Sequence, residues 1–409
     1  MMPCYGHFYG SEPLELVRGR GTRVWDAAGK EYFDFFTGVA VNSLGHCHPE
    51  VVEAVARQLE TLQHTTTLYL HESVVGLAET LARLAPTGLS RVFFCADGSG
   101  ANEGALLAAS AATGRRNFIA FDRGLHGRTA LTMEVTGIGF WKNDSFPMAR
   151  AHHVPTPMDE EGAEESLGAV ERLLNSPAGE EIAAFIAEPI LGNGGIVVPP
   201  HGYFRRLKAL LRAHGVLLIA DEVQTGFCRT GAWFGMQRHG VSPDLMSCAK
   251  ALGNGLPVAV WLATEEVAAA YTRPAASTFG GNLAAMAAAA TVVGIMERDG
   301  LAHIAEVRGS RFRALLAGAL SGFGEVAEVR GMGMMIGVEI GGPGNAAMAD
   351  CDRVLCALRD RGILAGKTGP GRNVLTFLPP LTATEEEIGF AAEATREAFA
   401  ATRGSSARC

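Results

Sequence analysis

Residues 217–227 read LLIADEVQTGF, and this stretch decides the fold class. An uninterrupted apolar run of strand length ends directly in two acidic residues, Asp221 and Glu222. Such a run is typical of a strand that is buried on both faces of a parallel sheet. Because an unpaired carboxylate at the end of a buried strand is very costly, the acidic residues imply a cationic partner there. A charged ring nitrogen of a bound cofactor would serve; an aspartate that caps a helix or forms a salt bridge is the alternative.

Short β-rich runs alternate with helical patterns on both sides of this stretch. We expect strands at 91–95, 117–121, 183–187 and 216–220, and helices at 101–113 and 203–214 that stop at Gly114 and Gly215. This alternation predicts an α/β fold, in which a mostly parallel central sheet carries helices on both faces.

A different pattern follows near the C-terminus. We expect strands at 335–340 and 373–378, a helix between them through about Arg361, and a capping box at 382–385 before a final helix. These elements predict a smaller α+β lobe. The chain is therefore expected to divide into an N-terminal segment (1–50), a large domain (51–290) and a C-terminal domain (291–409).

Composition and charge exclude several classes of protein. The chain has 409 residues, 48% of them hydrophobic, and a net charge of −8. An acidic balance argues against nucleic acids and anionic membranes as partners, because both require a concentrated positive face. The longest apolar stretch, 283–296, is shorter than a bilayer span, and the N-terminus has no apolar signal region. We therefore expect a cytoplasmic protein.

The cysteines give no indication of a metal site. Eight are scattered without a CxxC pair or a zinc-ligand spacing, so we expect them to be reduced thiols. Cys47 lies between His46 and His48, which favours a turn before a helix over a metal site.

Residues 95–104, CADGSGANEG, form a glycine-rich turn that leads into a helix. Backbone N–H groups at a helix start, together with the helix dipole, can bind a phosphate. Glu103 occupies the place of the last glycine in a dinucleotide fingerprint, so the turn favours a single phosphate over a dinucleotide. A helix capped by Asp97 or Ser99 is the equally acceptable structural interpretation.

Lys250 lies in SCAKALGNGLP, residues 247–257, among small and apolar neighbours. Such surroundings lower the pKa of an amine, so that a useful fraction is neutral and nucleophilic at neutral pH. A lone lysine is usually a surface residue whose amine reaches solvent, which is the alternative interpretation. Together, a phosphate-binding turn, the Asp221 carboxylate and a Schiff-base lysine are the three anchors that pyridoxal 5′-phosphate (PLP) requires.

With these residues in place, the sequence resembles the class III aminotransferases, the ornithine and acetylornithine type of the fold type I PLP-dependent enzymes. The resemblance covers nearly the whole chain and rests on seven ordered motifs. They are residues 25–55 (WDAAGKEYFDFFTGVAVNSLGHCHPEVVEAV), 124–129 (GLHGRT), 187–195 (AEPILGNGG), 221–234 (DEVQTGFCRTGAWF), 243–257 (PDLMSCAKALGNGLP), 277–282 (STFGGN) and 377–382 (FLPPLT).

The resemblance implies a role for each matching residue. Lys250 would be the Schiff-base lysine and proton shuttle, and Asp221 would pair with the pyridine nitrogen. The other cofactor-binding residues it implies are Gly98, Ser99, Leu125, His126, Glu188, Val223, Gln224 and, from a second subunit, Thr278. It therefore also implies a homodimer with active sites at the interface.

Some positions depart from the pattern of this family. Asp97 stands where Ser or Thr is common, Gly100 where Glu is common, and Leu125 where an aromatic residue stacks on the ring. We expect Asp97 to point away from the phosphate as a helix cap.

Other departures concern the substrate. Thr376 stands where relatives carry an arginine that clamps an α-carboxylate, and Asn193 where they carry the glutamate that masks this arginine. Loss of only the arginine or only the glutamate would leave the other charge buried without a partner. The loss of both together therefore indicates altered specificity. Arg128 remains as a candidate carboxylate ligand, and Tyr69 is a further candidate substrate residue.

The expected reaction is transfer of an amino group between a primary amine, either an ω-amine or a modified amino acid, and a keto acid such as 2-oxoglutarate or pyruvate. Decarboxylation, racemisation or epimerisation, or phospholyase chemistry on the same scaffold is the main alternative, since residues 187–196 also resemble a dialkylglycine decarboxylase. A binding protein that has lost catalysis is the remaining one.

Overall fold

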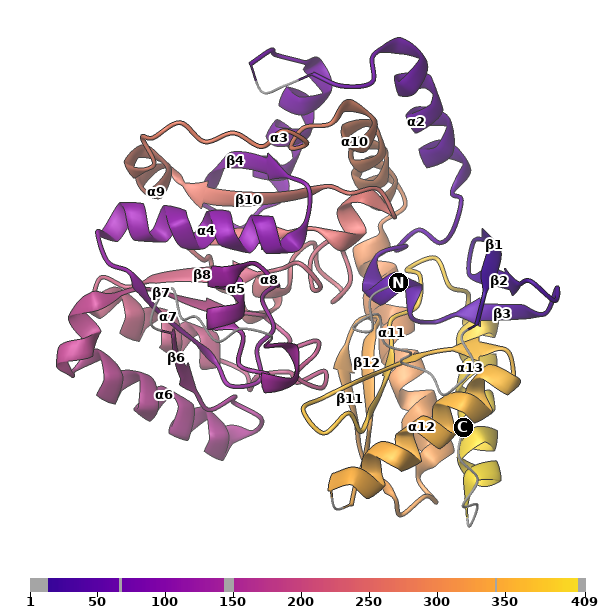
Figure 1. Cartoon of the computed structure of the whole chain (residues 1–409). Coiled ribbons are helices and arrows are strands. Elements are labelled where there is room, and N and C mark those ends of the chain that lie inside the picture. Colours follow the sequence, from indigo (N-terminus) through magenta and orange to yellow (C-terminus); the bar gives the residue numbers. More distant parts are fainter. Residues whose placement is uncertain (1–13, 66–67, 143–150, 343, 404–409) are drawn as a thin grey trace.

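The computed structural model describes residues 14–65, 68–142, 151–342 and 344–403. It contains a seven-stranded central sheet and two four-stranded sheets. Figure 1 shows the central sheet in one half of the molecule and the C-terminal strands and helices in the other, with the strands β1 to β3 beside the latter.

The central sheet confirms the predicted α/β fold. In spatial order its strands are β4 (Leu89–Cys95), β10 (Ala259–Thr264), β9 (Leu245–Cys248), β8 (Leu217–Asp221), β7 (Ile182–Ala187), β5 (Asn117–Phe121) and β6 (Ala151–Val154). Strands β9, β8, β7, β5 and β6 are parallel to one another, whereas β10 is antiparallel to both β9 and β4.

Alternate side chains of these strands enter two different cores. Phe118, Ile186 and Ile219 pack on one face, in a cluster with Leu106 of α4. Phe185 and Leu218 pack on the other face, in the main core. Because both faces are covered, the strands read as continuous apolar runs instead of alternating ones.

The helices of this half are α2 (Pro49–Thr61), α3 (Glu72–Leu84), α4 (Gly98–Thr113), α5 (Ala130–Val135), α6 (Glu160–Leu174), α7 (Tyr203–Ala213), α8 (Gly235–His239), α9 (Glu265–Ala270) and α10 (Leu283–Arg298), with 3₁₀ turns η1 (Gly139–Trp141), η2 (Pro177–Glu181) and η3 (Lys250–Gly253).

The start of α4 differs from the prediction. The helix begins at Gly98, three residues before the expected position, because the Asp97 side chain caps it by accepting a hydrogen bond from Gly100 N at 2.8 Å. Its end is as predicted, since Gly114 adopts a left-handed φ of 72°.

The C-terminal half is built on an antiparallel sheet. Its strands are β11 (Val326–Met332), β12 (Met335–Ile340), β15 (Val374–Phe377) and β14 (Gly366–Thr368), in this order, and its helices are α11 (Leu301–Leu320), α12 (Gly344–Asp360) and α13 (Glu385–Thr402). The capping box of α13 joins Thr384 and Glu387, two residues after the predicted one. The predicted α+β lobe is therefore present, with its last helix shifted.

The N-terminal segment forms a sheet with part of the C-terminal half. Strands β1 (Leu16–Arg20), β2 (Arg23–Asp26) and β3 (Glu31–Asp34) are antiparallel, β13 (Ile363–Leu364) joins β3 in parallel, and α1 (Thr37–Ala40) follows. The three domain boundaries expected from the sequence stay a prediction.

Arg229 connects three parts of the chain although its side chain is completely buried. It donates hydrogen bonds to the Met334 and Pro379 carbonyls at 3.1 and 2.5 Å and to Ser43 Oγ at 2.9 Å. Burial lowers its pKa to about 9. The guanidinium therefore ties the C-terminal half and the N-terminal segment to the domain that holds the central sheet.

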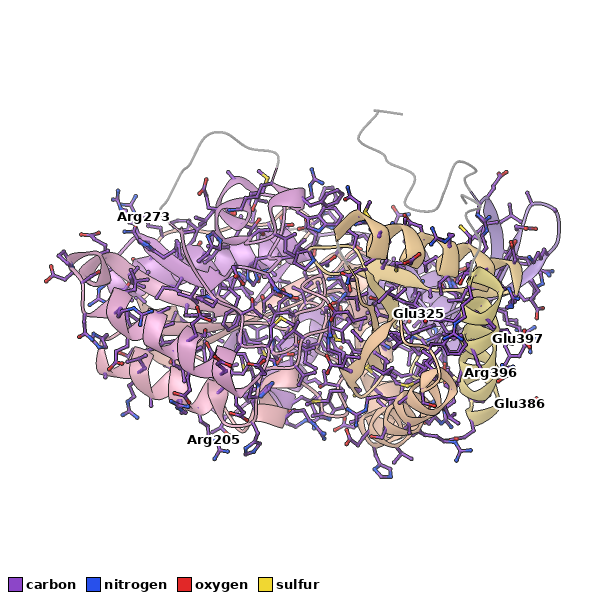
Figure 2. All side chains as sticks on the ribbon, turned by 90° about the horizontal axis from the view of Figure 1, so that it is seen from below. Arg205, Arg273, Glu325, Glu386, Arg396 and Glu397 are labelled. Carbon is purple, nitrogen blue, oxygen red and sulfur yellow. The ribbon has the colours of Figure 1, made fainter. Side chains whose placement is uncertain are left out.

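Charged side chains lie around the surface, as Figure 2 shows for Arg205 on the side of the central sheet and for Glu386 and Arg396 on α13. No helix within the described ranges is long and apolar enough to cross a bilayer. Among the described residues, five cysteines are free thiols, namely Cys47, Cys95, Cys228, Cys248 and Cys351. Cys356 is disulfide-bonded, which contradicts the expectation that every cysteine is reduced; its sequence spacing gave no sign of a pair.

Candidate active site

A cavity of about 520 Å³ lies beyond the ends of the central strands. Residues that follow five of these strands line it, as is usual for ligand sites of parallel sheets. They are Gly98 and Ser99 after β4, Leu125, His126 and Arg128 after β5, Glu188 after β7, Asp221, Val223 and Gln224 at and after β8, and Lys250 after β9. The structure therefore brings most of the predicted site residues to one place.

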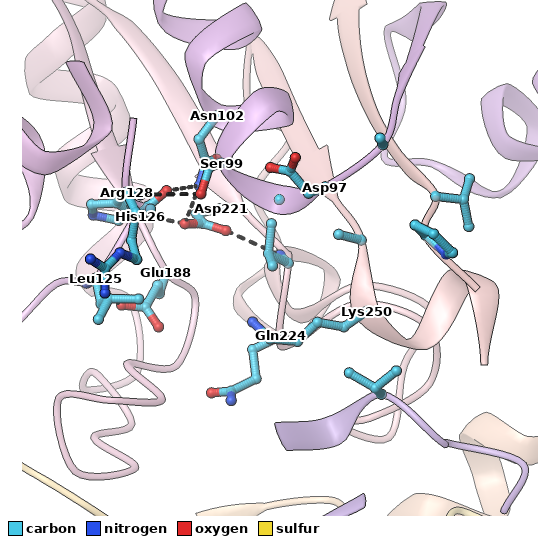
Figure 3. Close-up of a pocket in the computed structure, with 18 of the residues that line it drawn as sticks. Asp97, Ser99, Asn102, Leu125, His126, Arg128, Glu188, Asp221, Gln224 and Lys250 are labelled. Carbon is cyan, nitrogen blue, oxygen red and sulfur yellow. Dashed lines mark hydrogen bonds and ion pairs between the residues drawn. The ribbon is translucent and has the colours of Figure 1, made fainter. Parts of the chain in front are cut away.

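Asp221 occupies the floor of the cavity and is held at both oxygens. Its Oδ2 accepts a hydrogen bond from Asn102 Nδ2 and lies 2.8 Å from His126 Nδ1, and its Oδ1 accepts one from Val223 N at 3.1 Å (Figure 3). Only 3% of Asp221 is exposed. The carboxylate is therefore fixed in orientation and can hold a positive charge opposite it.

Asn102 is a site residue that the sequence analysis missed. Its Nδ2 donates to Asp221 Oδ2 at 2.8 Å and to the His126 carbonyl at 2.7 Å, and its Oδ1 accepts a hydrogen bond from the Ser247 hydroxyl. It lies on the buried face of α4 beside alanine and leucine residues. A polar residue at a core position of a helix beside the glycine-rich turn was the available signal.

Lys250 has the properties of a nucleophilic amine. Burial lowers its pKa, and the charges of Asp221 and Glu188 oppose this effect. Its φ of 43° lies in the left-handed region, which a non-glycine residue rarely adopts outside functional sites. Figure 3 shows its side chain extending toward Gln224.

Glu188 organises the neighbouring wall of the cavity. Its Oε1 accepts a hydrogen bond from Leu125 N, and its Oε2 accepts one from Gly192 N, both at 2.9 Å. Burial raises the pKa of Glu188 to about 7. A Cβ atom on Gly192 would lie 1.4 Å from Gln224 Oε1, so a side chain at position 192 would displace the Gln224 amide.

These residues fit pyridoxal phosphate. A Cβ atom on Gly98 would lie 2.8 Å from Val223 Cγ1, so a glycine packs there, and the backbone N–H groups at the start of α4 can bind a phosphate. Gln224 Oε1 is buried and has no partner within the described chain, so it can accept a hydrogen bond from a ligand. Asp97 caps α4 as predicted, yet it also lines the cavity instead of pointing away from it.

Arg128 and Asn193 also line this cavity; Arg128 is exposed and Asn193 half-buried, and we call their side of the cavity its mouth. Arg128 is exposed and its N–H donates to Ser99 Oγ at 3.1 Å. Within the described ranges no carboxylate pairs with its guanidinium. Arg128 is therefore available to bind an anionic group of a substrate.

Three predicted residues do not line the cavity. Thr376 is completely buried in β15, where its Oγ1 lies 2.8 Å from Thr368 Oγ1 and donates to the Val374 carbonyl at 3.0 Å. Tyr69 is 70% exposed, and Thr278 is also exposed. The side chain of Thr376 is thus satisfied within its own sheet, and Tyr69 and Thr278 lie on the outer surface.

The chain matches known proteins over most of its length. The model of the family described as aminotransferase class-III matches residues 6–399. An acetylornithine aminotransferase of Methanothermobacter thermautotrophicus is 39% identical over 94% of this chain and 93% of its own length.

Solved structures give the same result. An amine transaminase from an uncultivated Pseudomonas species, in its PLP-bound form, is 31% identical with a TM-score of 0.90 over 95% of each chain. An ornithine aminotransferase from Toxoplasma gondii is 31% identical with a TM-score of 0.86 over 96% of this chain and 92% of its own. The chain therefore belongs to the class-III aminotransferase family and is a PLP-dependent aminotransferase.

Proposed function

We propose that this aminotransferase takes the ω-amine of a modified diamino acid, of the N-acylornithine type, as its amino donor, and a 2-keto acid as its acceptor. The observation that carries the proposal is the arrangement of charge at the cavity mouth. Arg128 is exposed there and has no carboxylate partner among the described residues, while Asn193, which lines the same cavity, is neutral. Thr376, which takes the place of the expected clamp, is neutral and buried.

This arrangement suits a donor with one carboxylate far from its reacting amine. Arg128 would hold the carboxylate by paired, charge-assisted hydrogen bonds. A free α-amine would meet no anionic side chain at Asn193, so an acylated α-nitrogen is preferred over a charged one. The similarity to an acetylornithine aminotransferase supports this choice of donor.

We assign the roles at the cavity floor as follows. Bound PLP supplies the aldehyde that takes up the amino group and a ring that accepts the electron pair of the broken C–H bond. Lys250 removes and returns the proton at the donor carbon, because its lowered pKa favours the neutral amine. Asp221 stabilises a protonated ring nitrogen, and Asn102 and His126 keep it in position.

The remaining contacts orient and enclose the reacting atoms. Gly98 and Ser99 would hold the phosphate at the start of α4, and Val223 and Leu125 would pack against opposite sides of the ring. Gln224 would donate to the ring oxygen or accept from it. Glu188 supports this wall through its bonds to the backbone of Leu125 and Gly192.

We further propose a homodimer in which a second copy completes each site. Residues 63–65 and 277–282 lie side by side, since Asn282 Nδ2 donates to the Gln63 carbonyl at 3.4 Å. Residues 68–70 follow in the described part of the chain. These residues expose apolar side chains, with Leu70 93% and Phe279 64% exposed. An apolar surface of this kind favours contact with a second copy of the chain. In such a dimer, Thr278 of one copy would reach the cofactor phosphate in the site of the other, and Tyr69 would reach the substrate there. The cytoplasmic location stays a prediction.

The donor proposal is tested with two amines, N-acetylornithine and the same molecule without its carboxylate. The ratio of their kcat/KM values should fall about 100-fold in Arg128→Ala, because one charge-assisted pair is lost only for the first amine. Arg205→Ala, which changes an exposed arginine away from the cavity, should leave the ratio unchanged. An unchanged ratio in Arg128→Ala would show that the carboxylate binds elsewhere.

A further inference from the structure

Residues 188–198, named here the wall segment, follow β7, and Glu188 and Asn193 of this segment line the cavity. Leu191 and Val197 pair as an isolated antiparallel bridge, so the intervening residues form a closed loop. Asn193 lies in this loop and faces the cavity mouth. Any movement of the loop therefore moves Asn193.

Glu188 anchors the wall segment to its own domain at the cofactor side. Glu188 Oε2 accepts a hydrogen bond from Gly192 N at 2.9 Å, and Gly192 packs on Gln224. This anchor fixes the beginning of the loop beside the cavity floor.

The other side of the loop is held by the C-terminal half of the molecule. Arg330 of β11 donates from both Nε and Nη2 to the Gly195 carbonyl, at 2.9 and 2.7 Å. Gly369, which follows β14, donates from its N–H to the Asn193 carbonyl at 2.9 Å. The backbone on each side of Gly194 is therefore fixed by residues that are more than 130 positions away in sequence.

Arg330 is committed to this contact and cannot serve as a substrate clamp. Its Nη1 forms ion pairs with Glu328 at 2.7 Å and with Glu339 at 2.5 Å, and its side chain is only 10% exposed. In the sheet, Arg330 is paired with Gly337, which is paired with Thr376. A Cβ atom on Gly337 would lie 3.0 Å from Ile196 Cβ. Because glycine has no side chain, the wall segment can pack directly on the sheet at this position.

We propose that Arg330 is a positioning residue for donor recognition, which acts by holding Gly195 and through it Asn193 at the cavity mouth. The inference rests on the proposed function because it concerns the same donor site. Since Glu188 anchors the cofactor side independently, loss of Arg330 displaces the substrate side of the loop and leaves the cofactor contacts in place.

The experiment compares Arg330→Ala and Arg330→Lys with Arg313→Ala in the PLP-loaded enzyme. Arg313 donates to the Gly331 carbonyl at 2.9 Å in the same region of the fold and makes no bond to the wall segment, which makes it a matched control. Arg330→Ala should raise the donor KM on the order of 10-fold with kcat changed less than about 3-fold, because misplacing a binding contact weakens orientation. Arg330→Lys should recover part of the loss, since it keeps one donor.

Two further readouts do not depend on the donor. Hydrogen exchange of the peptide that spans residues 189–198 should accelerate in Arg330→Ala and not in Arg313→Ala, while the dissociation constant of PLP should stay within about 3-fold of the wild-type value. Unchanged exchange in this peptide, or a KM and PLP affinity that worsen together, would overturn the proposal. If acylated donors are poor substrates but another amine is accepted, the proposed donor class is wrong. The role of Arg330 is then tested by the KM for that amine and by hydrogen exchange of residues 189–198.

Discussion

The floor and the mouth of the cavity are built in different ways. At the floor, Asp221 is bonded at both carboxylate oxygens and Glu188 at both of its own, to groups of the domain that holds the central sheet. At the mouth, the Arg128 guanidinium is exposed, and Asn193 sits in a loop whose outer side is held by the C-terminal half.

The floor and the mouth determine different properties of the enzyme. A floor that is fixed by buried hydrogen bonds suits chemistry that must be the same for every donor, because pre-organised groups need not rearrange during the reaction. A mouth formed by an exposed cation and a loop held from another part of the fold can change without disturbing that floor. Reaction type is therefore expected to depend on the floor and donor choice on the mouth.

The largest effect is expected from a change at the floor. Lys250→Ala should abolish the visible absorbance band of the covalently attached cofactor and reduce kcat by at least about 10³-fold, since the nucleophile and the proton carrier are both lost. The variant should keep the fold, which circular dichroism and the melting temperature would report.

Lys250→Arg is the matched control for charge. Arginine keeps a cation at this position but stays protonated, so it should be as inactive as alanine. A Lys250→Ala enzyme with the absorbance band and wild-type turnover would refute the assignment of Lys250.

A smaller effect is expected at Thr376, where the family pattern suggested a substrate contact and the structure shows a buried side chain. Thr376→Val should change the donor KM less than about 3-fold and lower the unfolding free energy by about 1 kcal/mol, because only hydrogen bonds within the sheet are lost. Steady-state kinetics and chemical denaturation measure the two quantities. A large increase in KM without loss of stability would place Thr376 in the donor site after all.

Most of the floor could be predicted from the sequence because its chemistry is local. An apolar strand that ends in Asp221 and a lysine among small residues each carry their signal in a few neighbouring positions. The alternation of apolar strands and amphipathic helices likewise predicted the α/β class and the mostly parallel central sheet, although not the spatial order of its strands.

The rest depends on contacts between distant residues. Asn102 and Asp221 are 119 positions apart in the sequence, and Arg330 and Gly195 are 135 positions apart. The spacing of neighbouring residues could therefore predict neither contact. The start of α4 was misplaced because the Asp97 cap allows three small residues to join the helix. Thr376 was expected at the donor site from its position in a motif, although the direction of its side chain depends on the pairing of β15 with β12 and β14.

The half-reaction of the purified PLP-loaded enzyme with N-acetylornithine, in the absence of any keto acid, tests the roles of the floor and of Arg128 together. If the floor residues catalyse transamination and Arg128 binds the carboxylate of the donor, the absorbance band of the cofactor should convert completely to that of the pyridoxamine form. One equivalent of aldehyde product should form per site, and no carbon dioxide should be released. A band that does not change with this donor would contradict the proposed donor class, and release of carbon dioxide would identify a decarboxylase on the same scaffold.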